Sequence, residues 1–185
     1  MPDLTKALIF PEEMLIFLYK ENLHKKIKYI FLFNSLRYFI MRIYLDNCCF
    51  NCPYDDQTYI SISLETQAKL HIQDLIRKKQ IELATSYMLV YENGQNPYEI
   101  RKNTITEFIE NNTTIFVSIA KEKYVIEKAS KIMSTGVKYK DACHVACAIL
   151  SKSEYLLTTD YRLLKYKTDE IKIVNPLDFI KTLEV

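Results

Sequence analysis

The sequence predicts an α/β fold, a three-layer α/β/α sandwich around a central, mainly parallel sheet. From Met41 onward, short apolar runs alternate with longer stretches whose apolar residues recur at helical spacing. Repeated alternation of strand and helix is typical of a parallel sheet covered by helices. A chain of 185 residues, 49% of them hydrophobic, is also long enough to bury one substantial core.

The first expected strand is the apolar run 42–46, and a loop follows over 47–56, where a proline prevents a helix from continuing. A helix is expected over about 63–79 because its apolar residues form a single stripe. After a strand at 81–85, Ser86 is suited to cap a short helix, which a glycine and a proline then end.

A helix over about 98–110 leads to a strand at 114–117 and then to a helix over 121–134, which Gly136 ends as a C-cap. The last three expected elements are a short helix near 161–165, a strand at 171–174, and a helix that begins at Pro176 and reaches Leu183.

Residues 138–160 are the centre of the predicted site. Asp141 lies at the start of an apolar helix, and the strand 155–158 that follows this helix leads directly to Asp160. In an open α/β sheet, ligands bind outside the carboxyl ends of the strands. Asp160 lies at such an end, and Asp46 has the equivalent place at the end of the first strand.

Four carboxylates are therefore expected at one edge of the sheet: Asp46, Glu92, Asp141 and Asp160. Two unit charges about 4 Å apart repel by about 4 kcal/mol at an effective dielectric constant of about 20, so some acids must protonate or a cation must bind. Oxygen ligands select hard ions such as Mg²⁺ or Mn²⁺, whose waters can be activated to attack phosphate.

Each acid also has an ordinary structural interpretation. Asp141 and Asp160 could cap the helices that they begin, Asp46 could start a loop turn, and Glu92 could be a solvated helix charge. Taken singly, these interpretations compete evenly with a functional site. The placement of all four acids on one predicted edge favours the site.

Several segments resemble the PIN-domain nucleases, a family that includes the VapC-type toxins. These segments are 41–47 (MRIYLDN), 91–92 (YE), 140–146 (KDACHVA), 157–160 (LTTD) and 174–177 (VNPL). The resemblance extends from Met41 to about Phe179, and it rests on the order and spacing of the motifs together. Residues 1–40 depart from it, because the chains of this family usually begin near the first strand.

The resemblance implies an acidic pocket that holds one or two Mg²⁺ or Mn²⁺ ions and hydrolyses phosphodiester bonds, usually in RNA. The residues that match the acidic quartet are Asp46, Glu92, Asp141 and Asp160, and the polar neighbours are Asn47 and Thr158. The three aspartates would hold the metal. Glu92 would hold a second ion or orient the attacking water, while Asn47 and Thr158 would fix the geometry of water and ligands.

The expected domain organisation is an N-terminal extension, residues 1–40, and a PIN-like nuclease domain, residues 41–185. The extension is either an appendage or an over-extended start, since Met41 directly precedes the first strand, or a helix that packs on the domain or on a partner. Its apolar runs are far shorter than the roughly 20 residues that a membrane span needs. The expected partners are RNA, a small antitoxin protein and a second copy of the chain, with no membrane.

Charge and composition exclude several classes of protein. The net charge is +2, and the first 40 residues hold six of the 25 basic and four of the 23 acidic residues, which leaves 19 of each. Nucleic-acid binding must therefore come from a local patch. Two glycines in the whole chain exclude glycine-rich phosphate loops. Five cysteines without framework spacing, and no clean signal peptide, predict a cytoplasmic protein.

The cysteines offer two rival sites. Cys49 and Cys52 form a C-x-x-C motif after a strand, which is typical of thioredoxin-like redox sites, but the acidic loop that follows would raise the pKa of such a thiol. Cys143 and Cys147, four apart on one helix, could join Cys48 and its neighbours in binding zinc. Among alanines and valine, however, cysteine is more often a small buried hydrophobe.

Two further alternatives concern the same region. His144 is rotated from Asp141 around the helix and is interpreted as structural rather than as a catalytic base. The competing function is a PIN-like module that grips RNA or a protein without cleaving it. The complete acidic quartet favours the enzyme, a Mg²⁺- or Mn²⁺-dependent endoribonuclease.

Overall fold

The computed structural model describes residues 40–51, 54 and 56–183. The chain from Met41 to Val185 forms one compact unit. The expected N-terminal extension lies outside the described residues except for Ile40, and so do Cys52 and Pro53.

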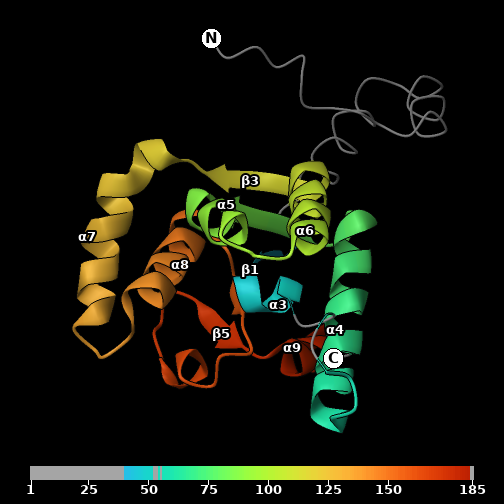
Figure 1. The fold of residues 1–185 in the computed structure, drawn as a ribbon. Helices are drawn as coiled ribbons and strands as arrows, with labels where there is room; N and C mark the ends of the chain where they lie inside the picture. Colours follow the sequence, from blue (N-terminus) through green and yellow to red (C-terminus); the bar gives the residue numbers. More distant parts are fainter. Residues whose placement is uncertain (1–39, 52–53, 55, 184–185) are drawn as a thin grey trace, which may run out of the picture. The chain divides into compact units, whose positions relative to one another are not determined.

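A sheet of five strands forms the centre of the described unit, in the order β3-β2-β1-β4-β5 (Figure 1). The strands are β1 (Arg42–Leu45), β2 (Glu82–Ser86), β3 (Thr113–Val117), β4 (Tyr155–Leu157) and β5 (Lys172–Val174). Every neighbouring pair is parallel. The predicted α/β class and parallel sheet are thus confirmed, and each predicted strand boundary lies within one residue of the observed one.

Helices connect the strands throughout the described part of the chain. They are α3 (Asn47–Asn51), α4 (Ile60–Arg77), α5 (Tyr87–Gly94), α6 (Glu99–Asn112), α7 (Glu122–Met133), α8 (Tyr139–Leu150) and α9 (Pro176–Leu183), with short 3₁₀ turns η3 (Ile119–Lys121) and η4 (Leu163–Lys165). None of the described helices is long and apolar enough to cross a membrane.

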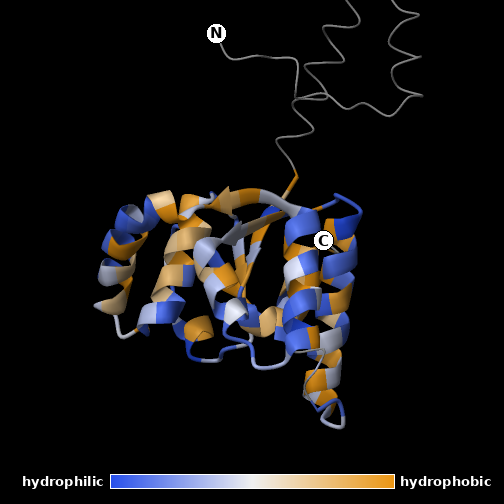
Figure 2. Ribbon diagram, turned by 45° about the horizontal axis from the view of Figure 1, so that its top comes forward, coloured by the Kyte–Doolittle hydropathy of each residue, from blue (hydrophilic) through white to orange (hydrophobic). Residues whose placement is uncertain are grey.

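The helices cover both faces of the sheet. Successive strand residues point to opposite faces, so Tyr44 packs into the core beneath α7 and α8, whereas Ile43 and Leu45 pack into the core beneath α4, α6 and α9. Figure 2 shows apolar residues gathered on the central strands and hydrophilic residues along the outer helices. This arrangement is compatible with the predicted three-layer sandwich.

The order of the strands reverses at β1. From there the chain builds β2 and β3 on one side, and later β4 and β5 on the other. In such a sheet, a crevice opens outside the carboxyl ends of the two strands at the reversal. Leu45 pairs with Leu157, so β1 and β4 end side by side. Asp46 and Thr158 are the next residues and meet at this crevice.

The predicted loop over 47–56 is wrong for its first half, where residues 47–51 form helix α3. The Asp46 carbonyl accepts a hydrogen bond from the Cys49 amide at 2.9 Å, and both Cys49 and Phe50 are buried in the core. Burial of these two side chains against the sheet outweighs the loop signal of the nearby polar residues and proline.

The sequence predicted an N-cap at Ser86 and a C-cap at Gly136. Ser86 caps α5 as predicted, because its side chain accepts a hydrogen bond from the Leu89 amide at 3.3 Å. Gly136 lies two residues beyond the observed C-cap of α7, Ser134, in a left-handed conformation with φ of 95°. Its amide donates to the Met133 carbonyl at 2.9 Å, so Gly136 forms the turn after the helix rather than the cap itself.

Candidate functional site

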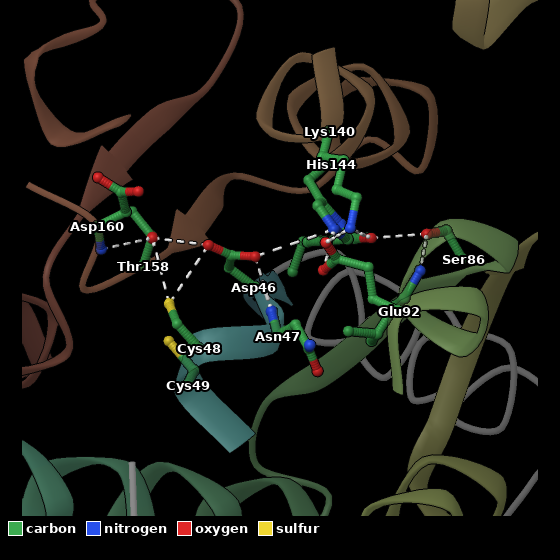
Figure 3. A network of polar contacts seen from close by, with 12 residues as sticks. Asp46, Asn47, Cys48, Cys49, Ser86, Glu92, Lys140, His144, Thr158 and Asp160 are labelled. Carbon is green, nitrogen blue, oxygen red and sulfur yellow. Dashed lines mark hydrogen bonds and ion pairs between the residues drawn. The ribbon is translucent and has the colours of Figure 1, made fainter. Parts of the chain in front are cut away.

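Asp46 lies directly after β1 and is only 7% exposed. Three groups donate hydrogen bonds to its carboxylate (Figure 3): Thr158 Oγ1 at 2.8 Å, the Asn47 amide at 2.7 Å and Cys48 Sγ at 3.3 Å. A buried carboxylate needs such donors, because burial without partners strongly disfavours the charged form. Asp46 is therefore held in one orientation at the reversal of the sheet.

Glu92 on α5 faces the carboxylate of Asp46. His144 Nε2 donates to Glu92 Oε2 at 2.9 Å and lies 4.0 Å from Asp46 Oδ1, while Lys140 Nζ is 3.5 Å from Glu92 Oε1. The hydrogen bond from His144, followed by the charges of His144 and Lys140, holds the pKa of Glu92 below its ordinary value despite partial burial. Ligand atoms of Asp46, Glu92 and His144 all lie within 4.8 Å of one another.

A series of buried hydrogen bonds also fixes His144 at the ring nitrogen that does not contact Glu92. Its Nδ1 is 2.8 Å from the Tyr44 hydroxyl, which is in turn 2.6 Å from Ser86 Oγ. All three residues are at most 1% exposed. Burial by itself would lower the pKa of His144, but the hydrogen bond to Glu92 and the charge of Asp46 outweigh it and raise that pKa. The imidazole is thus fixed at both nitrogens.

Asp141 lies in the first turn of α8 and is half-buried. Its carboxylate forms no hydrogen bond or ion pair with another described residue, and Lys138 is the N-cap, so Asp141 does not act as a cap. Burial raises the pKa of its carboxyl, and the negative charges of Asp46 and Asp160 raise it further. Asp141 therefore carries the negative charge of the cluster that has least compensation.

Asp160 and Asp46 are joined through one hydroxyl group. Thr158 Oγ1 donates to Asp46 and accepts the Asp160 amide at 3.0 Å. The Asp160 carboxylate accepts the Arg162 amide at 2.7 Å, and Arg162 Nη2 lies 3.5 Å away. Burial opposes the effect, but these Arg162 contacts lower the pKa of Asp160. The sequence suggested Asp160 as the cap of a helix beginning at Tyr161, but η4 begins at Leu163 with Arg162 as its N-cap, so Asp160 instead holds the turn before it, and Thr158 ties Asp160 to the site.

The predicted supporting residues lie at the cluster in different ways. Thr158 is fully buried and acts through its hydroxyl. Asn47 contacts Asp46 through its backbone amide, while its side-chain oxygen is buried without a hydrogen-bond partner among the described residues. The structure therefore gives Asn47 a part in orienting Asp46, through the main chain.

The rival cysteine sites receive little support from the described residues. Cys143 and Cys147 are fully buried in the apolar core, and Cys49 is buried with a pKa raised by burial. The one group of three close potential metal ligands in the described part of the chain contains no cysteine. Cys48, which the sequence offered only for zinc, donates to Asp46 instead.

The donor set suits a divalent cation. Two carboxylates and an imidazole converge, and Asp141 adds a carboxylate that has no hydrogen bond or ion pair among the described residues. Carboxylates are ligands for Mg²⁺ and Mn²⁺, while an imidazole nitrogen favours later transition metals. The carboxylates therefore fit the hard ion that the sequence implied, while His144 Nε2 is hydrogen-bonded to Glu92 rather than free as a ligand.

His144 is the main residue that sequence reasoning left outside the site. The spacing of three between Asp141 and His144 contained the signal, because residues at i and i+3 are neighbours on a helix surface. The interpretation that His144 is rotated away from Asp141 overlooked this relation, and the charge of Asp141 indeed acts on His144. Tyr44 and Lys140 carried no comparable signal, since their contacts cross from other elements.

No protein-family model and no curated protein matches this chain. The candidate site therefore rests on its own geometry.

We expect Asp141→Asn to stabilise the metal-free protein at neutral pH. The pKa of Asp141 is raised in the folded protein. Its contribution to the free energy of unfolding is therefore fully favourable only below the ordinary aspartate pKa of about 3.9, and it is lost as the pH rises through the raised pKa of the folded state. The gain should be about 0.5 kcal/mol, since solvent screens a half-exposed carboxylate. Urea unfolding in EDTA should show a larger gain at about pH 7.5 than at about pH 4. The exposed Asp169→Asn is the control, and a loss of stability in Asp141→Asn at both pH values would contradict the account.

Tyr44→Phe should destabilise the protein by about 1–3 kcal/mol, because removal of the hydroxyl leaves buried His144 Nδ1 and Ser86 Oγ each without one partner. Tyr155→Phe is the matched control on the adjacent strand. Its hydroxyl has only a 3.4 Å contact from Lys172, so we expect about 0.5 kcal/mol or less. Urea unfolding measures the stability of both variants. Equal losses would show that the buried series of hydrogen bonds adds no more stability than the contact of Tyr155 with Lys172.

Proposed function

We propose that this chain is a metal-dependent ribonuclease with a PIN-like fold. One observation carries the proposal: Asp46 and Glu92 face each other across a few ångströms where the strand order reverses, and the carboxyl pKa of Asp141 is raised by the nearby charges of Asp46 and Asp160. This reversal is where open α/β sheets bind ligands. The order of the sequence motifs supports the same reading, because the four acids follow the order of the PIN family's quartet.

The residues that would hold the ion are Asp46, Glu92, Asp141 and Asp160. A bound Mg²⁺ or Mn²⁺ would supply positive charge for hydrolysis of a phosphodiester bond. Thr158 orients the carboxylate of Asp46 and the backbone of Asp160 through a single hydroxyl. His144 orients Glu92, which makes Glu92 suited to position an attacking water.

The proposed biological setting follows from the same resemblance. The chain would act in the cytoplasm as the toxin of a toxin–antitoxin pair, with RNA as the substrate and a small antitoxin protein as the inhibitor. A homodimer is the proposed active form.

One observation favours the competing function, a PIN-like module that binds RNA or protein without cleavage. His144 and Lys140 already provide Glu92 with two partners in the absence of a cation. An ion would have to compete with them for this carboxylate. The distinction is therefore open to a direct test.

We expect millimolar Mn²⁺ to raise the melting temperature and to support cleavage of single-stranded RNA. A ligand that binds only the folded state stabilises it by about 2.7 kcal/mol at a concentration of 100 times its dissociation constant. Asp46→Asn should remove most of the stabilisation and lower cleavage by more than about 100-fold, since even outer partners of metal ligands cost about 10- to 100-fold. Differential scanning fluorimetry and product gels, with EDTA controls, measure the two effects.

Asp169→Asn serves as the control for the loss of one carboxylate, and it should keep both the thermal shift and the cleavage. Asp160→Asn should behave like Asp46→Asn, because residues that share one ion act as a unit. If inhibitor-free protein shows the thermal shift and binds RNA, but cleaves none of several unrelated RNAs, the non-cleaving module replaces the nuclease.

A further inference from the structure

A cavity of about 400 Å³ opens beside the acidic residues, between the α7–α8 loop and the segment around η4. Four cationic side chains line it, and they are Lys138, Arg162, Lys165 and Lys167. Asp141 is the one carboxylate among the lining residues, and it also feels the charges of Asp46 and Glu92. We call this cavity the basic pocket. It shares Asp141 with the acidic residues, but most of the charged side chains that line it are positive.

The cations of the basic pocket are largely uncompensated. Within the described residues, Lys138, Lys165 and Lys167 form no ion pair with a carboxylate. Lys165 Nζ lies 4.4 Å from the centre of the Tyr161 ring, and Lys167 donates to the Leu164 carbonyl at 3.1 Å. Of these four cations, Arg162 alone forms an ion pair within the described residues, with Asp160 at 3.5 Å. The charges remain available to an anionic ligand.

This local concentration of positive charge contrasts with the balanced charge of the domain as a whole. From residue 41 onward the chain has equal numbers of basic and acidic residues, 19 of each, so no general field attracts polyanions. A nucleic-acid strand that approaches four acids is also repelled by them. A local basic pocket next to those acids offsets the repulsion and gives the strand a defined place to bind.

We propose that the basic pocket binds a backbone phosphate of a single-stranded nucleic acid, next to the phosphodiester that lies at the acidic residues. This inference rests on the proposed nuclease function and adds a substrate subsite to it. Lysine ammonium groups bind phosphate as point charges, and arginine adds a planar pair of donors. Such contacts position the strand without reading its sequence.

The test measures binding of a fluorescent single-stranded RNA of about 12 nucleotides to the wild-type chain in EDTA, so that no cleavage occurs. Lys138→Gln with Lys165→Gln should weaken binding about 10- to 30-fold at about 0.1 M salt. The slope of log affinity against log salt should fall by about 1.4, since each contact to a single strand contributes about 0.7. Fluorescence anisotropy across a salt series provides both values.

The matched control uses two lysines at the opposite end of the domain. Lys138 directly precedes α8, Lys152 lies two residues beyond its last residue, and the helix between them is about 18 Å long. Lys79 precedes β2, and both Lys79 and Lys152 have φ of 58°. Lys79→Gln with Lys152→Gln removes the same charge and should change the affinity by less than about twofold and leave the salt slope unchanged. Lys138→Arg with Lys165→Arg keeps the charge and should retain wild-type affinity.

The outcomes separate the subsite from the catalytic proposal. RNA binding that depends on the basic pocket, in a protein that never cleaves RNA, supports the subsite and overturns the nuclease. Metal-dependent cleavage with unchanged RNA affinity in the pocket double variant supports the nuclease and overturns the subsite. Equal losses in the pocket and control double variants, or no RNA binding by the wild-type chain, also overturn the subsite.

Discussion

The pairing of β1 with β4 at the centre of the sheet is the constraint on which the rest of the site depends. These strands are distant in sequence, and Asp46 and Thr158, which follow them, are separated by 112 residues. Their pairing buries Asp46 at the sheet reversal and provides the hydroxyl that holds it. A carboxylate so poorly exposed costs stability unless hydrogen-bond donors such as this hydroxyl satisfy it. The sheet topology therefore creates the acidic crevice and also stabilises its central group.

His144 links this crevice to the core on one face of the sheet. Its ring is fixed by Tyr44 of β1 and by Glu92 of α5, and Ser86, which caps α5, completes the chain of hydrogen bonds. Because each buried polar group depends on the next, a change at one of them affects the whole series. This arrangement preorganises Glu92 before any ligand arrives, which limits the reorganisation needed for binding or catalysis.

The site combines local instability with a nearby excess of positive charge. Asp141 is held near other acids without a described partner, which costs stability in the metal-free protein. Active sites commonly retain such costs because the same charges serve the ligand. The basic pocket shares Asp141, so a divalent cation and a phosphate would each meet the opposite charge there. The two proposed roles of this edge are cation binding by the acidic residues and phosphate binding by the basic pocket. Both follow from the separation of negative and positive side chains on either side of Asp141.

The sequence by itself determined the α/β alternation, the strand positions, the Ser86 cap and the placement of Asp46 and Asp160 after strands, because these depend on periodicity and on residues close in the chain. Only the tertiary structure decided that residues 47–51 form a helix, since this depends on burial of Cys49 and Phe50 against the sheet. It also brought Tyr44 to His144, Cys48 to Asp46, and Lys138 and Lys165 to one pocket. Such contacts join separate elements, and their distances depend on how the helices pack on the sheet, which no local pattern in the sequence specifies.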